Sequence, residues 1–586
     1  MQRDIFRFLP VLLFSFLGCY FVQAQSVMLP SGHHWHGFVQ RMEIKSGGSA
    51  SQFHFALQPV ERKGMVEFLQ ETDTTARRLT RTDRFLINDI IQSNAEWITA
   101  PADTSERSLL KHFYRTPSDF YRRHENGLFL VINPVVHFGL GTETDRSLHL
   151  YQNTRGLEIR GMINEKVGFY TYMADNQARF PLYVNRKIQQ QEGAIPGEGW
   201  NIPFGEQGYD YFTARGYIAF QATENIGFQF GQDRNFLGYG QRSLLLSDYA
   251  NNYLFLKINT RIWRFHYQNI FARLVDWPLR TYGGRMFDPK YMAAHTLSFN
   301  ISDRFQLGVF ENVVFGRSDT LAPRRFDAHY LNPVIFYRAV EHHIGDPDKV
   351  SLGLFWRWIA GHRMAFYGQV YADDFHIGDI KYDIDSMLVY MGLRGERKYD
   401  LHASFRHKFG LQKGFHWVDF LGIDNLDLQM EGNWIRPFVY SHYSADGSGL
   451  RPASSYSHYS QSLGHPLGAN LREMMVNLQY LPHPDWLLKA TLFSARQGMD
   501  SAGINMGGNL FRDYVSRVGD YGHTFLQGEL RTWSFLQLGA SWQWRPNVWF
   551  DLQYVLRSEE QGATENRTGI FMAGLRVNAL KRNHWF

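Results

Sequence analysis

Apolar and polar residues alternate one by one over most of the chain beyond residue 128. Between Leu426 and Trp434, for example, each even position is apolar or glycine and each odd position is polar. Since successive side chains of a β-strand point to opposite faces, this period predicts strands with one apolar and one polar face. About 18 such segments of roughly ten residues lie between Leu128 and Leu580, and ten residues is the length that a tilted strand needs to cross a bilayer. They include Ile226–Asp233, Trp263–Leu274, Leu297–Ser302 and Leu401–Phe409.

The connections between these segments are unequal in length. Asn164-Glu165 and Glu224-Asn225 are predicted to be tight turns. Long connections are predicted over residues 176–210, 276–290, 317–349 and 440–470. Short turns on one side and long loops on the other are typical of membrane barrels.

Two architectures, a soluble sandwich and a membrane barrel, share this alternation. A sandwich turns its apolar faces inward, whereas a membrane barrel turns them outward, borders them with aromatic girdles and lines its lumen with the polar faces. The apolar faces here end in Trp434, Tyr480, Trp542 and Trp544, and the polar faces carry Asp427, Glu431, Arg264, Arg406 and Lys408. We therefore favour an all-β fold, an antiparallel transmembrane β-barrel of about 18 strands.

The N-terminal segment has the pattern of an export signal. Arg3 and Arg7 precede an apolar run from Phe8 to Val22, and Val22-Gln23-Ala24 predicts cleavage before Gln25. A membrane anchor, or a lipoprotein attached at Cys19, is the alternative. Because Cys19 is the single cysteine of the chain, the processed chain would have no disulfide, thiolate metal site or cysteine nucleophile.

Residues 25–125 do not alternate, and we expect a small, partly helical segment that lies on the periplasmic side or plugs the lumen. Thr82-Asp83 precedes the apolar positions Phe85, Ile87, Ile90, Ile91, Ala95 and Ile98, which predicts an amphipathic helix with a capping residue at its start. The expected parts of the chain are a signal peptide (1–24), this segment (25–125) and the barrel (126–586).

The end of the sequence suggests a second feature of membrane barrels. The last predicted strand runs from about Ile570 to Leu580, and Trp585-Phe586 follows. A terminal aromatic residue that closes the last strand is what the outer-membrane assembly machinery of Gram-negative bacteria recognises.

Composition removes several classes of protein. Aromatic residues make up 16% of the 586 residues, which is too large an apolar load for a disordered chain. The net charge of +5 includes no basic block, so nucleic acid is not an expected partner. Beyond the N-terminal segment, no apolar run reaches the roughly 18–20 residues of a transmembrane helix.

Specific residues add a resemblance to a known family. They are the stretch from Gly231 to Asp248, with Asp233, Arg242, Ser243 and Asp248, and a second motif with Asn332 and Pro333. These residues resemble the Wzi-like capsule assembly family, and within it the gliding-motility relatives of the RemB type. The likeness extends over most of the chain from about residue 83 onward, and residues 242–248 are its most specific part.

The resemblance implies an 18-stranded outer-membrane barrel with a small helical periplasmic segment that holds or assembles surface polysaccharide. It further implies outer-membrane lipid and surface polysaccharide as partners, with other surface or motility proteins as further candidates. It assigns no individual sugar-binding residue.

Nothing in the sequence supports catalysis, a metal site or a cofactor. Each candidate has a plainer interpretation: His33-His34-Trp35-His36 as a flexible polar tail, Glu341-His342-His343 as a loop without zinc-protease spacing, Gly238-Tyr239-Gly240 as a loop bend, and Asp373-Asp374 as a solvated rim. The Gly-x-Ser-x-Gly elbow of serine hydrolases does not occur.

One predicted loop is rich in tyrosine, serine and histidine. It contains Tyr440, His442 and Tyr443, and further along Tyr456, His458 and Tyr459. Aromatic rings stack on the apolar faces of sugars while hydroxyl and imidazole groups exchange hydrogen bonds with sugar hydroxyls, so these six residues are the predicted carbohydrate contacts. The alternative is a loop that folds on its own aromatic residues.

These patterns together predict a non-enzymatic outer-membrane barrel that binds, anchors or assembles surface polysaccharide and supports adhesion or gliding. The alternative function is a porin or transport channel, and an outer-membrane phospholipase or protease is a third class without a supporting motif. Interlocked Arg and Asp or Glu side chains in the lumen would favour the first function, whereas rings of one sign would favour conduction.

Overall fold

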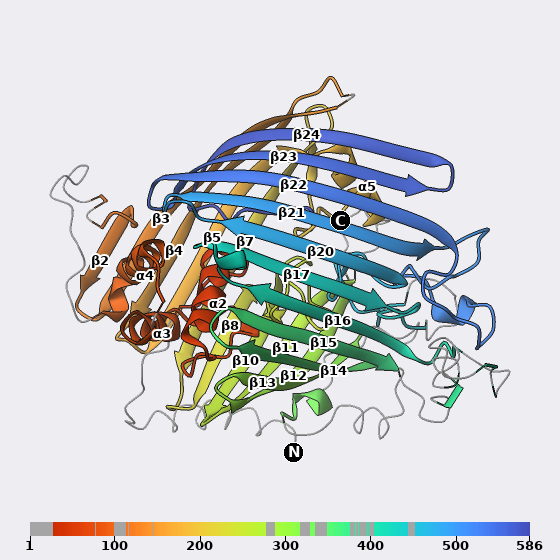
Figure 1. The fold of residues 1–586 in the computed structure, drawn as a ribbon, viewed down its shortest axis with the longest axis horizontal. Helices are drawn as coiled ribbons and strands as arrows, with labels where there is room; N and C mark the ends of the chain where they lie inside the picture. The colour runs from red at the N-terminus through yellow and green to blue at the C-terminus, as the bar shows by residue number, and fades with distance from the viewer. Residues whose placement is uncertain are drawn as a thin grey trace, which may run out of the picture.

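Eighteen antiparallel strands close into a barrel in the computed structural model (Figure 1). The structure describes residues 27–76, 78–98, 113–114, 116–144, 146–276, 288–316, 328–333, 348–374, 381–382, 385, 395–396, 398, 403–443 and 452–586. The barrel strands are β3 (Leu128–Glu143), β4 (Leu150–Ile163), β5 (Val167–Arg179), β7 (Gly208–Gln221), β8 (Ile226–Asp233), β10 (Tyr253–Ile262), β11 (Phe265–Asp276), β12 (Asp288–Ser302), β13 (Phe305–Phe315), β14 (Lys349–Ala360), β15 (Met364–Asp374), β16 (Lys408–Trp417), β17 (Leu426–Ile435), β20 (Leu471–Tyr480), β21 (Trp486–Met499), β22 (Glu529–Arg545), β23 (Val548–Gln561) and β24 (Thr564–Val577).

The expected fold class is confirmed, because each strand pairs with its neighbour and the last strand closes on the first. β24 pairs with β3 from Ile570 opposite Glu143 to Val577 opposite Val136. Two short strands, β2 (Tyr121–Glu125) and β6 (Ile202–Phe204), pair in addition with β3 and β7. No helix among the described residues is long and apolar enough to cross a membrane.

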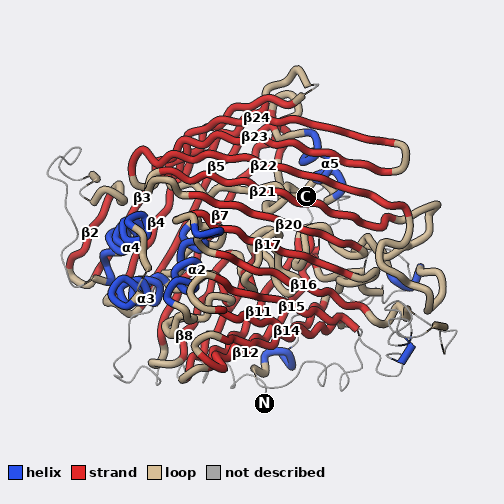
Figure 2. The backbone as a smooth tube through the Cα atoms, in the orientation of Figure 1, coloured by secondary structure: helices blue, strands red, loops and turns tan. Residues whose placement is uncertain are grey.

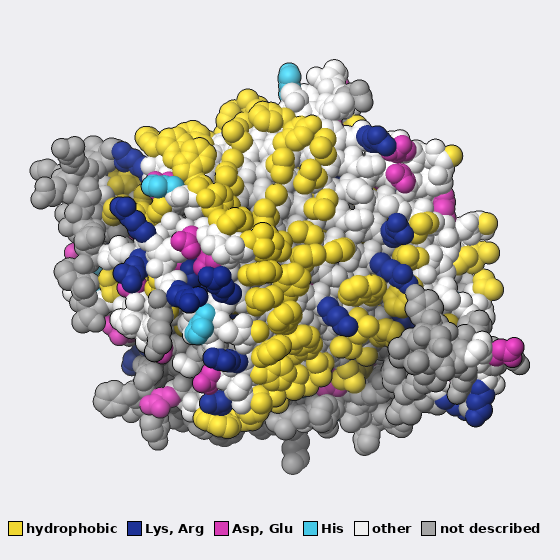
Figure 3. Space-filling model, in the orientation of Figure 1, with side chains coloured by type: hydrophobic (Ala, Val, Ile, Leu, Met, Phe, Trp, Pro, Cys, Tyr) yellow, Lys and Arg dark blue, Asp and Glu magenta, His cyan; other side chains and the backbone are white. Residues whose placement is uncertain are grey.

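The apolar faces of the strands point outward. On β22 and β23, Leu538 and Leu552 are about half exposed, while the alternate residues Gln537 and Asp551 are buried inside. Figure 3 shows the result as a continuous band of hydrophobic side chains, with charged groups gathered on both sides of it. Several exposed tryptophans lie near one border of the band: Trp263, Trp358, Trp486, Trp542 and Trp544. An apolar band with an aromatic border is the surface that a bilayer requires.

The two ends of the barrel differ. At one end, which we call the short-turn end, tight turns such as Asn164-Glu165 join the strands, and both residues have positive φ. At the other, the long-loop end, the connections include residues 180–207, 234–252 and 436–470. The predicted difference in connection length is confirmed.

Three helices, α2 (Trp35–Ser46), α3 (Arg62–Thr75) and α4 (Arg81–Ser93), lie together at the short-turn end (Figure 2). The predicted amphipathic helix is α4. Its cap is Thr80, whose hydroxyl accepts from the N–H of Asp83 while the Asp83 carboxylate accepts from the N–H of Thr80. This reciprocal capping satisfies two main-chain donors, so the helix begins slightly earlier than predicted.

Buried ion pairs tie these helices to the barrel. The Arg41 guanidinium, 1% exposed, donates to Asp83 of α4, to Asp419 and to Asp427 of β17, and Lys45 donates to Asp83 at 2.5 Å. Burial alone would lower the pKa of Arg41, but Asp427 and Asp83 raise it above its ordinary value. Oppositely charged side chains therefore interlock in the lumen.

Residues 234–252, which we call the inward loop, fold from the long-loop end into the lumen. Within this loop, β9 (Phe236–Leu237) pairs with β1 (Leu57–Gln58). Gly238 has φ 142°, and a Cβ there would fall on the Gln369 amide of β15. The predicted loop bend at Gly238-Tyr239-Gly240 is confirmed, and glycine allows the loop to approach the opposite wall closely.

Residues 578–586, which we call the lumen tail, correct the prediction for the last strand. β24 ends at Val577, and the tail turns into the barrel instead of extending the strand to Leu580. The Trp585 indole donates to Gln537 at 2.7 Å, and the Phe586 ring is 5% exposed. Because Arg582 and Trp585 find polar partners inside, the tail is more stable in the lumen than on the sheet.

The predicted strand Leu401–Phe409 is also wrong. Residues 403–407 form turns, and β16 begins at Lys408. The Phe405 ring is buried under the Arg517 guanidinium at 3.5 Å, so a contact distant in sequence overrides the local alternation. Two of the predicted lumen charges, Arg264 and Arg406, are instead partly or largely exposed, the first in a turn beside Asp303.

The remaining secondary structure is short. It comprises the 3-10 helices η1 (Ala95–Trp97), η2 (Ala328–Leu331), η4 (Phe420–Gly422) and η5 (Tyr514–Ser516), a hairpin of β18 (Ser457–His458) and β19 (Gln461–Ser462), and α5 (Leu182–Gln190). The helix α5 lies at the long-loop end, apart from the other three helices (Figure 2).

Candidate functional site

The helix α5 lies in the long connection between β5 and β7. Pro181 precedes it, and the Glu143 carboxylate accepts from the N–H of Leu182 at 3.0 Å, which stabilises the positive end of the helix dipole. Val184 and Ile188, one turn apart, are buried. The opposite face carries Tyr183, Arg186, Lys187 and Gln190, which are spaced so that they share one side of a helix.

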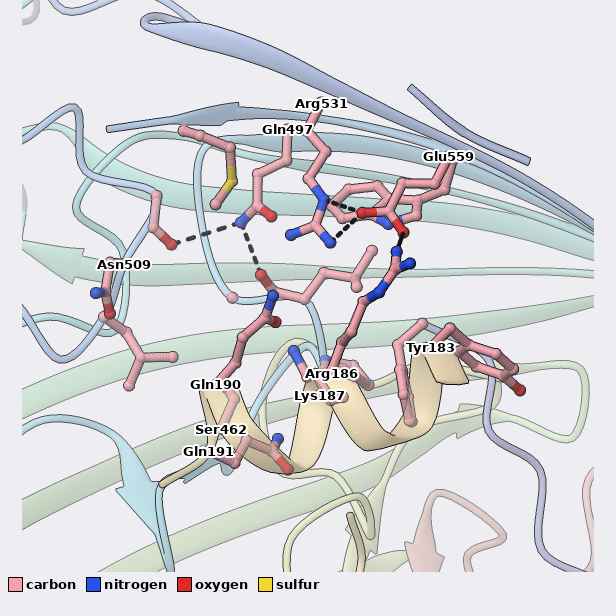
Figure 4. A pocket seen from close by; sticks show the side chains of 18 of the residues that line it. Tyr183, Arg186, Lys187, Gln190, Gln191, Ser462, Gln497, Asn509, Arg531 and Glu559 are labelled. Atoms are coloured by element: carbon pink, nitrogen blue, oxygen red, sulfur yellow. Dashed lines mark hydrogen bonds and ion pairs between the residues drawn. The ribbon is translucent and has the colours of Figure 1, made fainter. Parts of the chain in front are cut away.

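This polar face of α5 lines a pocket of about 390 Å³, which we call the α5 pocket. The other walls are formed by the loops at 460–468 and 508–511 and by the inward faces of β21, β22 and β23. In Figure 4, Arg186 rises from the helix to Glu559, and Lys187 and Gln190 lie on the same side of the helix. Ligand pockets in proteins are commonly about 300–1,000 Å³, so the cavity can hold a small ligand or a short stretch of a polymer.

Arginines of three different elements surround one carboxylate in this pocket. Glu559 of β23 accepts from Arg531 Nε of β22 at 2.7 Å and from Arg557 Nη1 at 2.7 Å, and Arg186 of α5 lies 3.7 Å away. The second lining carboxylate, Asp500, is paired at 2.9 Å with Arg512, which is outside the pocket.

Lys187 has no carboxylate within ion-pair distance among the described residues. Its ammonium group lies 5.8 Å from the centre of the Phe586 ring. Burial, together with the neighbouring Arg531 and Arg242, lowers the pKa of Lys187 to about 8. The ammonium is therefore still mainly protonated at neutral pH, in a place where the folded protein disfavours its charge.

Aromatic and amide groups complete the pocket. The Tyr183 and Phe511 side chains are partly exposed, whereas Trp533 and Phe586, which also line the pocket, are buried. Gln190 is exposed at the edge, and Gln497 donates its amide to the carbonyls of Leu467 and Ala469. Exposed rings beside hydrogen-bonding groups are the features that bind sugars.

The six predicted carbohydrate contacts differ in burial in the structure. Tyr440 and Tyr456 have no exposed surface, and their hydroxyls donate to the carbonyls of Leu244 and Leu245 in the inward loop. Both rings pack against Tyr371 of β15, with centroids 4.9 and 6.0 Å from it. These two tyrosines thus hold the inward loop in place and offer no ring face to a sugar in this conformation.

The two predicted histidines are buried as well, whereas the other two tyrosines are not. His458 accepts from the N–H of Val275 at 2.9 Å, and His442 stacks on Tyr514 at 5.8 Å. Burial lowers the pKa of each histidine to about 3, so both are neutral. Tyr443 and Tyr459 keep partly exposed side chains. Carbohydrate binding by this group stays a prediction, and these two tyrosines are its accessible members.

Four of the six family-motif residues lie in or beside the inward loop. Arg242 donates to Glu473 of β20 at 2.9 Å, and the Ser243 hydroxyl donates to the Leu237 carbonyl at 2.6 Å. Asp248 accepts from the Ser31 hydroxyl at 2.6 Å, and Asp233 accepts from the N–H of Arg234 at 2.8 Å. The most specific part of the motif therefore encodes a loop that crosses the lumen.

The other two motif residues, Asn332 and Pro333, lie elsewhere. Both are exposed, and the Pro333 carbonyl accepts from the Tyr267 hydroxyl of β11. The neighbouring candidates Glu341, His342 and His343 lie outside the described residues, as does the predicted signal peptide.

Two of the plainer interpretations are wrong. His33-His34-Trp35-His36 is no flexible tail, because Trp35 and His36 are buried in and beside α2, and burial lowers the pKa of His36 to about 4. Asp373 is no solvated rim residue, because it is 7% exposed and pairs with Lys349. Among the described residues, no three His, Cys, Asp or Glu side chains come together as metal ligands.

The sequence patterns do not predict the residues of the α5 pocket. They predict only a long connection between β5 and β7, although Tyr183, Arg186, Lys187 and Gln190 have helical spacing after a proline. That signal could have revealed the helix. The arginines of β22 and β23 carried no signal of their own, since charged residues on the polar face of a barrel strand are expected.

Comparisons with known proteins bear on the fold. No family model and no curated protein sequence matches this chain. Among solved structures, the chain is similar to Wzi, described as an outer-membrane protein involved in group 1 capsule assembly in Escherichia coli and as a carbohydrate-binding β-barrel. The identity is 12%, the TM-score is 0.54, and the match covers 95% of this chain and 99% of that one. It is also similar to OprD of Pseudomonas aeruginosa, with 9% identity, a TM-score of 0.40 and coverage of 76% and 94%.

The fold is thus that of an outer-membrane β-barrel with 18 strands. At 12% identity, the likeness to Wzi establishes the fold alone. The finer relation to gliding-motility proteins stays a prediction from the sequence motifs.

Proposed function

We propose that this protein is a non-enzymatic outer-membrane barrel that binds and organises surface polysaccharide at its long-loop end. The observation that carries the proposal is the α5 pocket, where the partly exposed Tyr183 and Phe511 lie beside guanidinium and amide donors. The likeness to Wzi, a barrel described as carbohydrate-binding, supports the same class of ligand.

The position of the pocket agrees with a ligand outside the cell. Outer-membrane barrels place short turns in the periplasm and long loops outside. The α5 pocket lies among the long connections, and the helices α2, α3 and α4 lie at the opposite end. With this orientation, a glycan at the cell surface reaches α5 without crossing the membrane.

A channel is the second candidate function, and the lumen argues against it. The helix α2, the inward loop and the lumen tail all enter the lumen, each tied to the wall by ion pairs: Glu43 with Arg357, Arg242 with Glu473, and Lys581 with Asp551. Such interlocked pairs of opposite sign favour a plugged frame over a conducting pore. Display of a glycan on a rigid frame is the mechanism that this arrangement supports.

The test combines glycan binding with conductance. The purified barrel in detergent is incubated with surface polysaccharide from the producing cells, and bound glycan is quantified by co-precipitation. Phe511→Ala removes a partly exposed ring from the pocket. It should weaken binding several-fold, since stacking on an aromatic ring contributes on the order of 1 kcal/mol. Val515→Ala, an exposed position in the same loop region, is the matched control.

In planar bilayers the same protein should show no stepwise current. Stepwise currents together with an absence of glycan binding would replace the proposal with the channel. The accessible tyrosines Tyr443 and Tyr459 form a second candidate contact region, and their double replacement by alanine tests the original prediction without disturbing the buried Tyr440 and Tyr456. A role in adhesion or gliding, with other surface or motility proteins as partners, is a further proposal that follows the sequence resemblance.

A further inference from the structure

The charges of the α5 pocket do not balance. Its lining includes four cations, Arg186, Lys187, Arg531 and Arg557, and two carboxylates, of which Asp500 is neutralised by Arg512 from outside. Only Glu559 is left to oppose the four cations. Around Arg41, at the short-turn end, carboxylates outnumber the cations. The lining of the α5 pocket, in contrast, has an excess of positive charge.

Two donors in the pocket are not used by the protein. The Lys187 ammonium has no carboxylate partner among the described residues and contacts only the Phe586 ring. Arg531 uses Nε and Nη2 for Glu559, which leaves Nη1 without a hydrogen bond within the described part of the chain. Both side chains are partly exposed and line the cavity, so these donors are open to a ligand that supplies the acceptor.

We propose that the α5 pocket selects acidic sugars, with the carboxylate of a uronic acid residue bound between Lys187 and Arg531. The inference rests on the proposed function and names the class of glycan. A planar carboxylate accepts two hydrogen bonds from donors on different elements, one from α5 and one from β22. The sugar ring then lies against the partly exposed Tyr183 or Phe511, and Gln190 at the edge meets its hydroxyls.

The position of these cations separates a glycan from a lipid. Arg531, Arg557 and Glu559 occupy inward-facing positions of β22 and β23, alternating with the exposed outward residues Leu530 and Leu556. A lipid headgroup at the outer surface of the barrel therefore does not reach them, whereas a polymer that enters from the long-loop end does. Free phosphate shares the charge of a carboxylate and has to be distinguished by experiment.

The experiment measures binding of defined oligosaccharides to the full-length barrel in detergent by isothermal titration calorimetry. The acidic probe is a tetramer of galacturonic acid, the neutral probe is the matching tetramer of galactose, and inorganic phosphate is the competitor. The wild type should bind the acidic tetramer at least tenfold more tightly than the neutral one. Higher salt should reduce this preference, because it screens charge interactions.

The variant Arg186→Gln combined with Lys187→Gln should weaken binding of the acidic tetramer at least tenfold and binding of the neutral tetramer by a much smaller factor. The matched control is Arg84→Gln combined with Lys166→Gln, which removes the same charge from exposed positions at the short-turn end. Heat-modifiable migration on gels verifies that each variant is folded. Should the double variant not fold, Lys187→Gln alone carries the test, since it breaks no ion pair that the structure describes.

The outcomes separate the inference from the function beneath it. Equal binding of both tetramers, unchanged in the variant, would overturn acidic selectivity and leave glycan binding standing. Phosphate that displaces the acidic tetramer at equal concentration would also overturn it, because the pocket would then be a site for small anions. Failure of both tetramers and of the native surface glycan to bind would overturn the proposed function itself.

Discussion

The two ends of the lumen contain similar charged side chains, but these charges are compensated around Arg41 at one end and not in the α5 pocket at the other. At the short-turn end, Arg41 and Lys45 meet three carboxylates, Asp83, Asp419 and Asp427, and every one of these side chains is less than 10% exposed. At the long-loop end, Arg186, Arg531 and Arg557 share Glu559, and together with Lys187 they line a cavity. Charge that is compensated inside the protein stabilises the frame, whereas charge that lacks a partner marks a place for a ligand.

Replacement of Arg41 by methionine should have the largest effect, because it breaks the compensated end. Three buried carboxylates would lose their shared guanidinium, and loss of one partner from a buried ion pair costs about 3–5 kcal/mol. The expected result is a much lower unfolding midpoint in denaturant. Arg84→Met, at an exposed position of α4, is the control. Equal midpoints for both variants would show that the network at the short-turn end contributes no stability.

Gly238→Ala should destabilise the inward loop, which lies between the two ends of the lumen. A side chain at φ 142° is strained, and its Cβ would collide with the Gln369 amide, so we expect a loss of about 1–3 kcal/mol in unfolding free energy. Gly361→Ala is the comparison, since that glycine has φ 73° and open space around it, and should cost about 1 kcal/mol or less. A smaller loss at Gly238 than at Gly361 would mean that the inward loop is not held against β15.

The pH dependence of glycan binding sharpens the comparison at the long-loop end. The pKa of Lys187 is about 8, lowered by burial, so raising the pH from 7 to 9 removes its charge. Affinity for the acidic tetramer should fall up to tenfold over this range, which is about 1.4 kcal/mol. Lys187→Arg keeps the charge and should bind equally at both pH values. A flat profile in the wild type would show that Lys187 does not touch the carboxylate.

The charged groups around Lys187 are arginines and one carboxylate. Arg186 lies on its own helix, Arg531 on β22, Arg557 on β23 and Arg242 in the inward loop, and Glu559 on β23 is paired with Arg531 and Arg557. Arginine side chains do not lose their charge in proteins. His465, buried beside Glu473, has a pKa lowered by burial and is outside the window. A pH effect between 7 and 9 is therefore assigned to Lys187.

The smallest expected effect is a gain in the free energy of unfolding when the charge of Lys187 is removed. Because the pKa of Lys187 is lower in the folded protein than its ordinary value of 10.5, the folded state binds this proton more weakly than the unfolded state. The free energy of unfolding should consequently rise as the pH increases from 8 to 10.5. At pH 7, Lys187→Met should raise it by about 1 kcal/mol, and this gain should shrink near pH 10. A loss of stability at pH 7 would show that the ammonium is compensated after all.

The sequence alone predicts the barrel, because the alternation of apolar and polar residues along a strand is a local pattern. The apolar outward face of Leu538 and the polar inward face of Gln537 are adjacent in sequence, and the bilayer-facing surface follows from their order alone. The amphipathic helix α4 is predicted for the same reason, although its cap is Thr80 and not the predicted Thr82. The local pattern predicts the wrong structure where a residue makes a contact with a distant part of the chain, as Phe405 does with Arg517.

Charge compensation, in contrast, depends on residues that are hundreds of positions apart. Arg41 pairs with Asp427, and Arg242 pairs with Glu473. Arg531 shares Glu559 with Arg186 of α5. An alternating sequence specifies that these side chains point inward, but it does not specify which of them face one another across the lumen. The tyrosine loop shows the same limit, since Tyr440 and Tyr456 are buried by an inward loop that lies about two hundred residues earlier. Strand pattern and membrane-facing surface are thus local properties of this chain. The ion pairs inside the lumen and the excess cations of the α5 pocket arise only when the barrel closes, because closure brings distant inward faces into contact.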